Sequence, residues 1–271
     1  MRHESSGLKR HDMKIRFAET AEEIRAAQRL RYHVFHDERG ARLQGQQGID
    51  EDRFDARADH LLVIEPVGEG QAEFPVEFPV ADGNLIGTYR MIPHQPGASQ
   101  QAFYSATEYD LAPLLARKPD LRFLELGRSC VLARARGTAV VELLWQGIWD
   151  YVRAHRIDVM LGCASFDGTD PAAHAEALSF LAHDIATPDD WRVAALPERL
   201  QPMHLLPKAG YNAKRVLTSL PPLIKGYLRL GCHFGEGCVI DHDFNTVDVL
   251  VVLPVSAINP RYFARFGAPQ G

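Results

Sequence analysis

The sequence has few cysteines, no long apolar run and no excess of basic residues. Its four cysteines form no C-x-x-C pair, so neither a disulfide framework nor a structural zinc site is expected, and free thiols in a reducing compartment are predicted. No apolar run reaches the roughly 20 residues that cross a bilayer. The formal net charge of −5 argues against a dedicated nucleic-acid binder, but it does not exclude a local basic patch.

The composition that is present suits a folded protein. Apolar residues make up 46% of the chain and charged residues 24%, which is enough to bury a full core. The N-terminus is polar and lacks the apolar core of a secretory signal. We therefore expect residues 1–13 to form a mobile tail and residues 14–271 to form a single domain in the cytoplasm.

Apolar periodicity predicts alternating strands and helices. The capping box Thr20-Ala-Glu-Glu23 marks the start of the first helix. Strands are expected at 14–18, 61–64, 85–91, 123–132, 157–163 and 247–253, and helices at 20–38, 137–155, 171–183 and 223–230. Residues 39–58 are expected to form a long loop, residues 65–83 a loose hairpin insertion, and residues 184–222 give no clear pattern. This alternation indicates an α/β layered fold.

A basic turn precedes the second long helix, where Arg134, Arg136, Gly137, Thr138 and Ala139 follow a strand. Small residues there let backbone N–H groups approach a phosphate at a helix N-terminus, and arginines add charge-assisted contacts. A short basic turn before a helix is common in other proteins. Its R-x-x-G-x-A pattern and position resemble the loop with which GNAT-like acyltransferases hold the phosphates of coenzyme A.

A set of charged residues recurs at fixed spacing. In chain order these are Arg31 with Phe35, Asp52 with Asp55, Arg90, and Glu125 with Arg128. They could be surface ion pairs that contribute little to stability, but a charged residue inside an apolar strand needs a partner of opposite charge. Glu125 and Arg128 should face opposite sides of a regular strand, unless a bulge intervenes.

This order of residues resembles the signature of the N-acylhomoserine lactone synthases, which are GNAT-like enzymes that use acyl-acyl carrier protein. The tryptophan that follows the phenylalanine in that family is absent here. Glu38, Arg39 and Gly40 occupy the neighbourhood.

A second resemblance covers residues 15–266. The segments RYHVF, DRFD, GTYR, ELGR, LWQG, GCASF, PPLIKGY and DF, the last at residues 243–244, resemble the ornithine lipid N-acyltransferases. The resemblance implies a GNAT-like fold: a mixed central sheet flanked by helices, with a C-terminal extension. It also implies transfer of a 3-hydroxyacyl chain from acyl carrier protein to the α-amine of L-ornithine, giving lyso-ornithine lipid.

The same resemblance implies roles for individual residues. Glu125, Arg128, Asp52 and Asp55 are the expected catalytic set, with Glu125 as the base, the aspartates holding the cationic ends of ornithine, and Arg31 or Arg128 pairing its carboxylate. Phe35, Arg90 and Lys225 are expected to contact substrate. Residues Arg134 to Ala139 are expected to bind the phosphopantetheine of the carrier protein, which Arg153 and Arg156 would help to dock. Direct attack of the amine is expected, with no bound cofactor and no metal.

Two alternatives remain. One is an N-acyl amino acid or lactone-type synthase with another amine acceptor, and the other is a non-catalytic module that binds acyl carrier protein. Residues 221–230 could contact the inner face of the cell membrane, although core packing explains them equally well.

Overall fold

The strands and helices expected from the periodicity are present in a computed structural model, which describes residues 13–42, 46–67 and 76–258. The described chain divides into two compact units. The first runs to Met91 and resumes over Gly127–Tyr151, and the second comprises Ile92–Leu126 and the chain from Val152 onward. Residues 1–12 of the expected tail and residues 259–266 of the family resemblance lie outside the described residues.

The first unit has an antiparallel sheet. Strand β1 (Lys14–Phe17) pairs with β2 (Asp59–Glu65), which pairs with β4 (Gly83–His94). The short strand β3 (Pro79–Val80) pairs with the start of β4. This unit also holds the end of β6 (Phe123–Val131) from Gly127. Of the expected hairpin insertion, residues 68–75 lie outside the described part.

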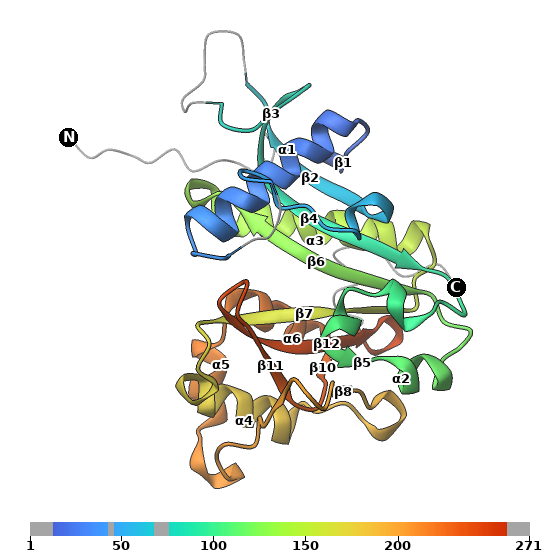
Figure 1. Cartoon of the computed structure of the whole chain (residues 1–271), viewed down its shortest axis with the longest axis vertical. Helices are drawn as coiled ribbons and strands as arrows, with labels where there is room; N and C mark the ends of the chain where they lie inside the picture. The colour runs from blue at the N-terminus through green and yellow to red at the C-terminus, as the bar shows by residue number, and fades with distance from the viewer. Residues whose placement is uncertain (1–12, 43–45, 68–75, 259–271) are drawn as a thin grey trace, which may run out of the picture. The chain divides into compact units, whose positions relative to one another are not determined.

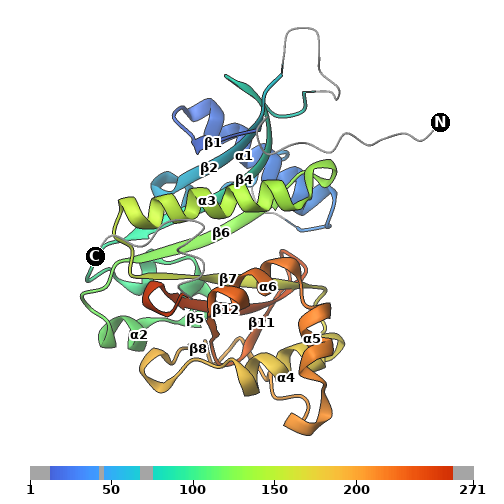
Figure 2. The same ribbon diagram turned by 180° about the vertical axis from the view of Figure 1, so that it is seen from behind.

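Two helices cover opposite faces of this sheet (Figures 1 and 2). Helix α1 (Ala21–Tyr32) starts at Thr20, whose hydroxyl accepts the N–H of Glu23, and continues as a π-helical turn, His33–Asp37. Helix α3 (Thr138–Ala154) packs closely on the other face at Gly147, where a Cβ would lie 2.7 Å from Ile15 and 2.8 Å from Leu61. Gly147 therefore sets how near α3 comes to β1 and β2.

The second unit has a mixed sheet. The first half of β6 pairs in parallel with β7 (Val159–Asp167), and β7 pairs antiparallel with β12 (Thr246–Pro254). Strands β11 (Cys238–Asp241) and β10 (His233–Phe234) both pair with β12, and β9 (Leu200–Gln201) pairs with β11. Strands β5 (Tyr109–Asp110) and β8 (Ala194–Ala195) form a separate ladder.

Helices α2 (Ala112–Arg117), α4 (Ala175–Asp184), α5 (Ala213–Ser219) and α6 (Pro222–Leu230) complete this unit. Its core joins Phe103, Tyr109 and Leu114 to the apolar face of β7 and β12. Within the described part of the chain, no helix is long and apolar enough to cross a membrane. The parallel and antiparallel pairings confirm the predicted mixed α/β fold.

Candidate active site

Arg31 is fully buried in the first unit and binds two aspartates. Its Nε lies 2.8 Å from Asp50 Oδ2, and its Nη1 and Nη2 donate to the two oxygens of Asp55 at 2.7 and 3.0 Å. Nη2 also donates to the carbonyl of Asp50. A buried charge requires partners of opposite charge, and the two aspartates supply them. These contacts also fasten helix α1 to the loop that follows it.

Two further arginines bind aspartates of the same loop. Arg90 Nη1, from β4, lies 2.7 Å from Asp52 Oδ1 and 3.4 Å from Asp55 Oδ2. Arg128, from β6, donates to Asp50 at 3.1 Å and to Asp52 at 3.3 Å. We call the three arginines and three aspartates the charge cluster: Arg31, Asp50, Asp52, Asp55, Arg90 and Arg128. Its guanidinium groups balance its carboxylates one for one.

The electrostatics of the cluster keep Asp55 ionised and His60 neutral. Burial alone would raise the pKa of Asp55, but the hydrogen bonds and charge of Arg31, with the charge of Arg90, lower it to about 2. Burial and the charge of Arg31 lower the pKa of His60 to about 4, although its Nε2 lies 3.6 Å from Asp55. His60 therefore adds no charge to the balanced cluster at pH 7.

Arg128 has an unusual backbone conformation for a strand residue. Its φ is 52°, in the left-handed region that few residues other than glycine adopt. Such strain costs on the order of 1–3 kcal/mol and persists only when the surroundings impose it. Here the contacts of Arg128 with Asp50 and Asp52 stabilise the distortion. The distortion interrupts the regular alternation of side chains in β6, as the sequence analysis allowed for in the case of a bulge.

A pocket of about 550 Å³ lies beside the cluster in the first unit. It is lined by Ile24, Gln28, Glu51, Asp52, Arg53, Asp55 and Ala56, so charged side chains and apolar surface both contribute to its wall. The side chains of Asp52 and Arg128 are 24% and 11% exposed, whereas Arg31 is fully buried. Asp52 and Arg128 are thus the members of the cluster that solvent reaches most easily.

Glu125 lies in the second unit and is held by backbone donors. Its two oxygens accept the N–H groups of Tyr104 and Ser105 at 2.8 and 2.7 Å, and His94 Nε2 lies 3.6 Å away. Burial alone would raise the pKa of Glu125, but His94 and Ser105 lower it overall. These hydrogen bonds favour the charged form of Glu125, and its role as the base remains a prediction.

The basic turn before α3 pairs with acidic residues of the first unit. Arg134 Nη2 lies 2.7 Å from Glu65, while Arg136 donates to the carbonyl of Val131 at 3.0 Å and to the carboxylate of Glu38. Gly137 has open space where a Cβ would lie, and Ala139 is in the first turn of α3. The side chain of Thr138 lies outside the described part of the structure.

The other predicted contact residues are placed as follows. Phe35 lies in the π-helical turn after α1, where its carbonyl accepts the N–H of Ala41 at 2.8 Å. Lys225, in the second unit, donates to the carbonyl of Thr218 at 2.5 Å and so ties α6 to the end of α5. The contact of Lys225 with substrate remains a prediction.

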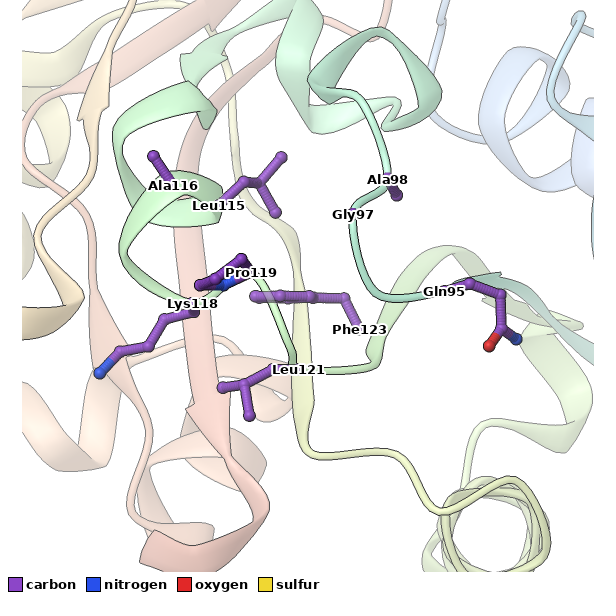
Figure 3. Close-up of a pocket in the computed structure, with 9 residues that line it drawn as sticks. All are labelled: Gln95, Gly97, Ala98, Leu115, Ala116, Lys118, Pro119, Leu121 and Phe123. Atoms are coloured by element: carbon purple, nitrogen blue, oxygen red, sulfur yellow. The ribbon is translucent and has the colours of Figure 1, made fainter.

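A smaller cavity, of about 210 Å³, lies in the second unit (Figure 3). Residues 95–98 line one side and α2 with its following turn lines the other, over Phe123. Leu115, Pro119, Leu121 and Phe123 make much of its wall apolar.

The structure brings together Arg31, Asp52, Asp55, Arg90 and Arg128 of the predicted set. Asp50 and His60 also belong there, and the sequence reasoning missed them. His60 pairs with Arg90 in the β2/β4 register, so strand alternation could have revealed it. Glu125 and Lys225 belong to the other unit.

Comparison with known proteins gives consistent matches. The model of the acetyltransferase (GNAT) domain matches residues 30–146. The chain is 48% identical over 262 residues to an L-ornithine N(alpha)-acyltransferase of Brucella abortus (strain 2308), covering 94% of this chain and 89% of that protein. It is 38% identical over 251 residues to an L-ornithine N(alpha)-acyltransferase of Rhodobacter capsulatus, covering 92% of each.

Among solved structures, the fold is similar to FeeM, an N-acyl amino acid synthase from uncultured soil microbes. The TM-score is 0.52 at 12% identity, covering 93% of this chain and 98% of that one. This match and the domain model confirm the predicted GNAT-like fold.

Proposed function

Because the chain belongs to the L-ornithine N(alpha)-acyltransferase family, we propose that it transfers a 3-hydroxyacyl group from acyl-acyl carrier protein to the α-amine of L-ornithine. The observation that carries the proposal is the 48% identity to a protein of that name over 94% of this chain. The product would be lyso-ornithine lipid, and the acyl-phosphopantetheine of the carrier protein would be a co-substrate rather than a resident cofactor.

The cysteines favour direct attack over a covalent acyl-enzyme. Burial raises the pKa of Cys130 to about 12, that of Cys232 to about 12 and that of Cys238 to about 11, and raises that of Cys163 well above its ordinary value. Since the thiolate is the nucleophilic form, these thiols are poorly suited to accept the acyl group. In the proposed step the amine forms the C–N bond, the C–S bond breaks, and the amine proton ends on the released phosphopantetheine thiol.

In the proposed enzyme, the charge cluster is a scaffold that holds residues near the substrate in place. Since its charges balance internally, its chief role is to fix the segment from Asp50 to Asp55 against α1, β4 and β6. Asp52 and Arg128 are its members open to substrate. We assign Arg134 and Arg136 to the phosphate of the phosphopantetheine, which would compete with Glu65 and Glu38 for them.

The proposal is tested with purified protein, 3-hydroxyacyl-acyl carrier protein and a panel of amines: L-ornithine, L-lysine, L-homoserine and glycine. Mass spectrometry should find N-acylornithine as the main product, and acyl-coenzyme A in place of the carrier protein should give much less. Acylation of another amine in preference to ornithine would reassign the acceptor. Tight binding of carrier protein without any product would instead indicate a non-catalytic module.

A further inference from the structure

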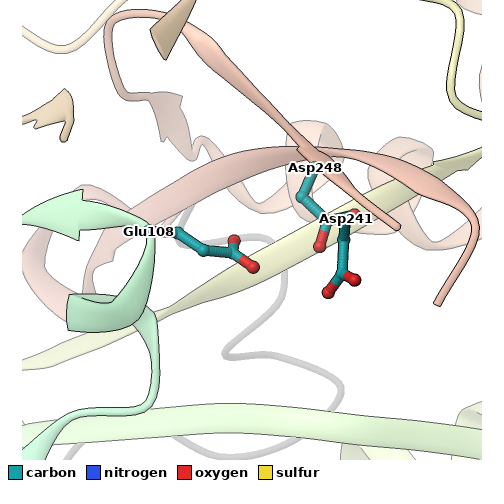
Figure 4. Close-up of side chains that lie close together, drawn as sticks. All are labelled: Glu108, Asp241 and Asp248. Carbon is teal, nitrogen blue, oxygen red and sulfur yellow. The ribbon is translucent and has the colours of Figure 1, made fainter. Parts of the chain in front are cut away.

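Three buried carboxylates meet on one face of the sheet in the second unit (Figure 4). Glu108, Asp241 and Asp248 each place a carboxylate oxygen within 4.8 Å of the other two. All three are at least nine-tenths buried. They lie outside the set of residues to which the sequence and the proposed function assign roles, and we call them the carboxylate trio.

The fold brings the trio together from segments far apart in the chain. Strand register sets Asp241 opposite Thr246 and Val239 opposite Asp248, so Asp241, Thr246 and Asp248 share one face of β11 and β12. Glu108 reaches this face from the end of the 3-10 turn Ser105–Thr107. The backbone N–H groups of Asp243 and Phe244 fix Asp241 by donating to its Oδ1 at 2.8 and 3.0 Å.

Within the trio, Glu108 is held in an environment that disfavours its charged form. Arg199 acts on Glu108 through its charge, but its N–H groups donate to the carbonyls of Thr107 and Ile240 at 2.8 and 3.4 Å. Glu108 Oε2 is buried and has no hydrogen-bond partner among the described residues. Burial and the charge of Asp248 raise the pKa of Glu108 to about 8, so Glu108 is mainly protonated at pH 7 until a cation binds beside it and favours its charged form. The charge cluster of the first unit, by contrast, holds one arginine for each aspartate.

A second polar group points to a ligand at the same place. The hydroxyl of Thr246 is nine-tenths buried, lies on the face of the trio across from Asp241, and likewise has no hydrogen-bond partner in the described part of the chain. Buried polar atoms without partners are rare in folded proteins unless a ligand or water satisfies them. The neighbouring Ser165 and Asp167 share this face by register and are exposed, so solvent reaches the face beside Thr246 and Asp248.

We propose that Glu108, Asp241 and Asp248 bind the side-chain ammonium group of the acceptor amino acid. The inference rests on the proposed function. An ammonium has three N–H donors and no acceptor, and three oxygens within 4.8 Å of one another can each lie about 2.8 Å from one nitrogen. The α-amine must lose its charge to attack, whereas the side-chain ammonium stays cationic throughout. It is therefore the group that needs a permanent counter-charge.

This assignment makes the trio a specificity determinant. An acceptor of the same length without the terminal ammonium, L-norvaline, would leave Glu108 Oε2 without a hydrogen-bond partner on binding. A site built to pair a charged group discriminates strongly against an analogue that lacks it, because its own buried groups then stay unpaired. The wild-type chain should accordingly acylate L-ornithine far faster than L-norvaline at equal concentration.

The test compares kcat/KM for L-ornithine and L-norvaline in the wild type, Glu108→Gln, Asp241→Asn and Asp248→Asn. Asp243→Asn is the matched control, because Asp243 is exposed and two residues from Asp241. Each trio variant should lower the preference for ornithine at least tenfold and keep its norvaline rate within about threefold. The control should keep the wild-type preference. Equal losses with both acceptors, or an unchanged preference, would overturn the inference.

A binding measurement, which does not depend on acyl transfer, separates this inference from the proposed function. L-ornithine, but not L-norvaline, should raise the Tm of the wild-type chain, and Asp248→Asn should abolish the shift. If the shift is seen but no acylornithine forms, the inference stands and the proposed function fails. If acylornithine forms but both amino acids shift the Tm equally, the inference alone is overturned. Loss of activity in EDTA, restored by Mg²⁺ or Ca²⁺, would assign the trio to a metal instead and overturn the inference too.

Discussion

Glu125 and Glu108 lie at opposite ends of the 3-10 turn Ser105–Thr107. Glu125 accepts the N–H of Ser105, the first residue of the 3-10 turn, at 2.7 Å, and Glu108 is the residue at which that turn ends. A carboxylate fixed by two backbone donors therefore positions the loop that carries a second carboxylate into the sheet. We therefore expect Glu125 to affect activity by positioning this loop.

Glu125→Gln should lower kcat/KM for the acyl transfer at least tenfold, because the amide can accept only one of the two N–H groups and sets its own NH₂ against the other. If Glu125 acts by positioning the loop and not as the base, the fall in kcat/KM on the acidic side of the pH profile should occur at the same pH as in the wild type. The exposed Glu198→Gln is the control and should leave activity unchanged. Disappearance of this fall in Glu125→Gln would support the assignment of Glu125 as the base.

Arg31→Met should destabilise the fold by about 3–5 kcal/mol, because it leaves the buried Asp50 and Asp55 without their main partner. Urea unfolding followed by circular dichroism measures the loss. Arg25 lies on the same helix and pairs with Glu51 in an exposed position, so Arg25→Met should cost only about 0–1 kcal/mol. Similar losses in both variants would show that the charge cluster contributes little net stability.

The pH dependence of stability should contain a component from His60. Its folded pKa of about 4 lies below its ordinary 6.5, so the unfolded chain takes up the proton first as the pH falls. The free energy of unfolding should therefore decrease between about pH 6.5 and pH 4, and His60→Gln should remove this part of the slope. The exposed His242→Gln should retain it. An identical slope in His60→Gln would mean that His60 is protonated in the folded cluster.

Gly162→Ala should be costly where β6 and β7 pair. A Cβ on Gly162 would lie 2.1 Å from the carbonyl oxygen of Leu126, and backbone cannot move aside as a flexible side chain can. Overpacking of this kind costs about 1–3 kcal/mol, which chemical denaturation would detect. Gly127→Ala is the control, because a Cβ there meets nothing within 4 Å. Equal stability of the two variants would show that β6 yields at this point.

The long periodic elements can be predicted from the sequence because their apolar spacing is set locally. The strands predicted at 85–91 and 247–253 lie within β4 and β12. Strand β7 begins two residues later than the predicted 157–163 and extends beyond it to Asp167. Exposed and buried residues alternate in this last part, so the apolar run used for the prediction does not cover it. The short strands β9 and β11 and helices α2 and α5 are not predicted, since so few residues show no clear period.

The charge cluster can be predicted in part, and the carboxylate trio cannot. Motif order identifies Arg31, Asp52 and Asp55, but Asp50 requires knowledge of which loop oxygens reach the guanidinium groups. The trio joins Glu108 to Asp241 and Asp248, which lie more than a hundred positions later in the sequence, so no local motif contains all three. Asp248 does carry one usable signal, because it is a charged residue inside the apolar run of β12.

Asp50, Asp52 and Asp55 come from one stretch of six residues, while the three arginines they bind come from α1, β4 and β6. This irregular stretch cannot detach while the charges remain paired. Opening it would take the aspartates away from the buried Arg31 and Arg90 at once. Its amide protons should therefore exchange with solvent only when the whole first unit opens, and a protease should find it as resistant as a core strand despite its lack of regular structure.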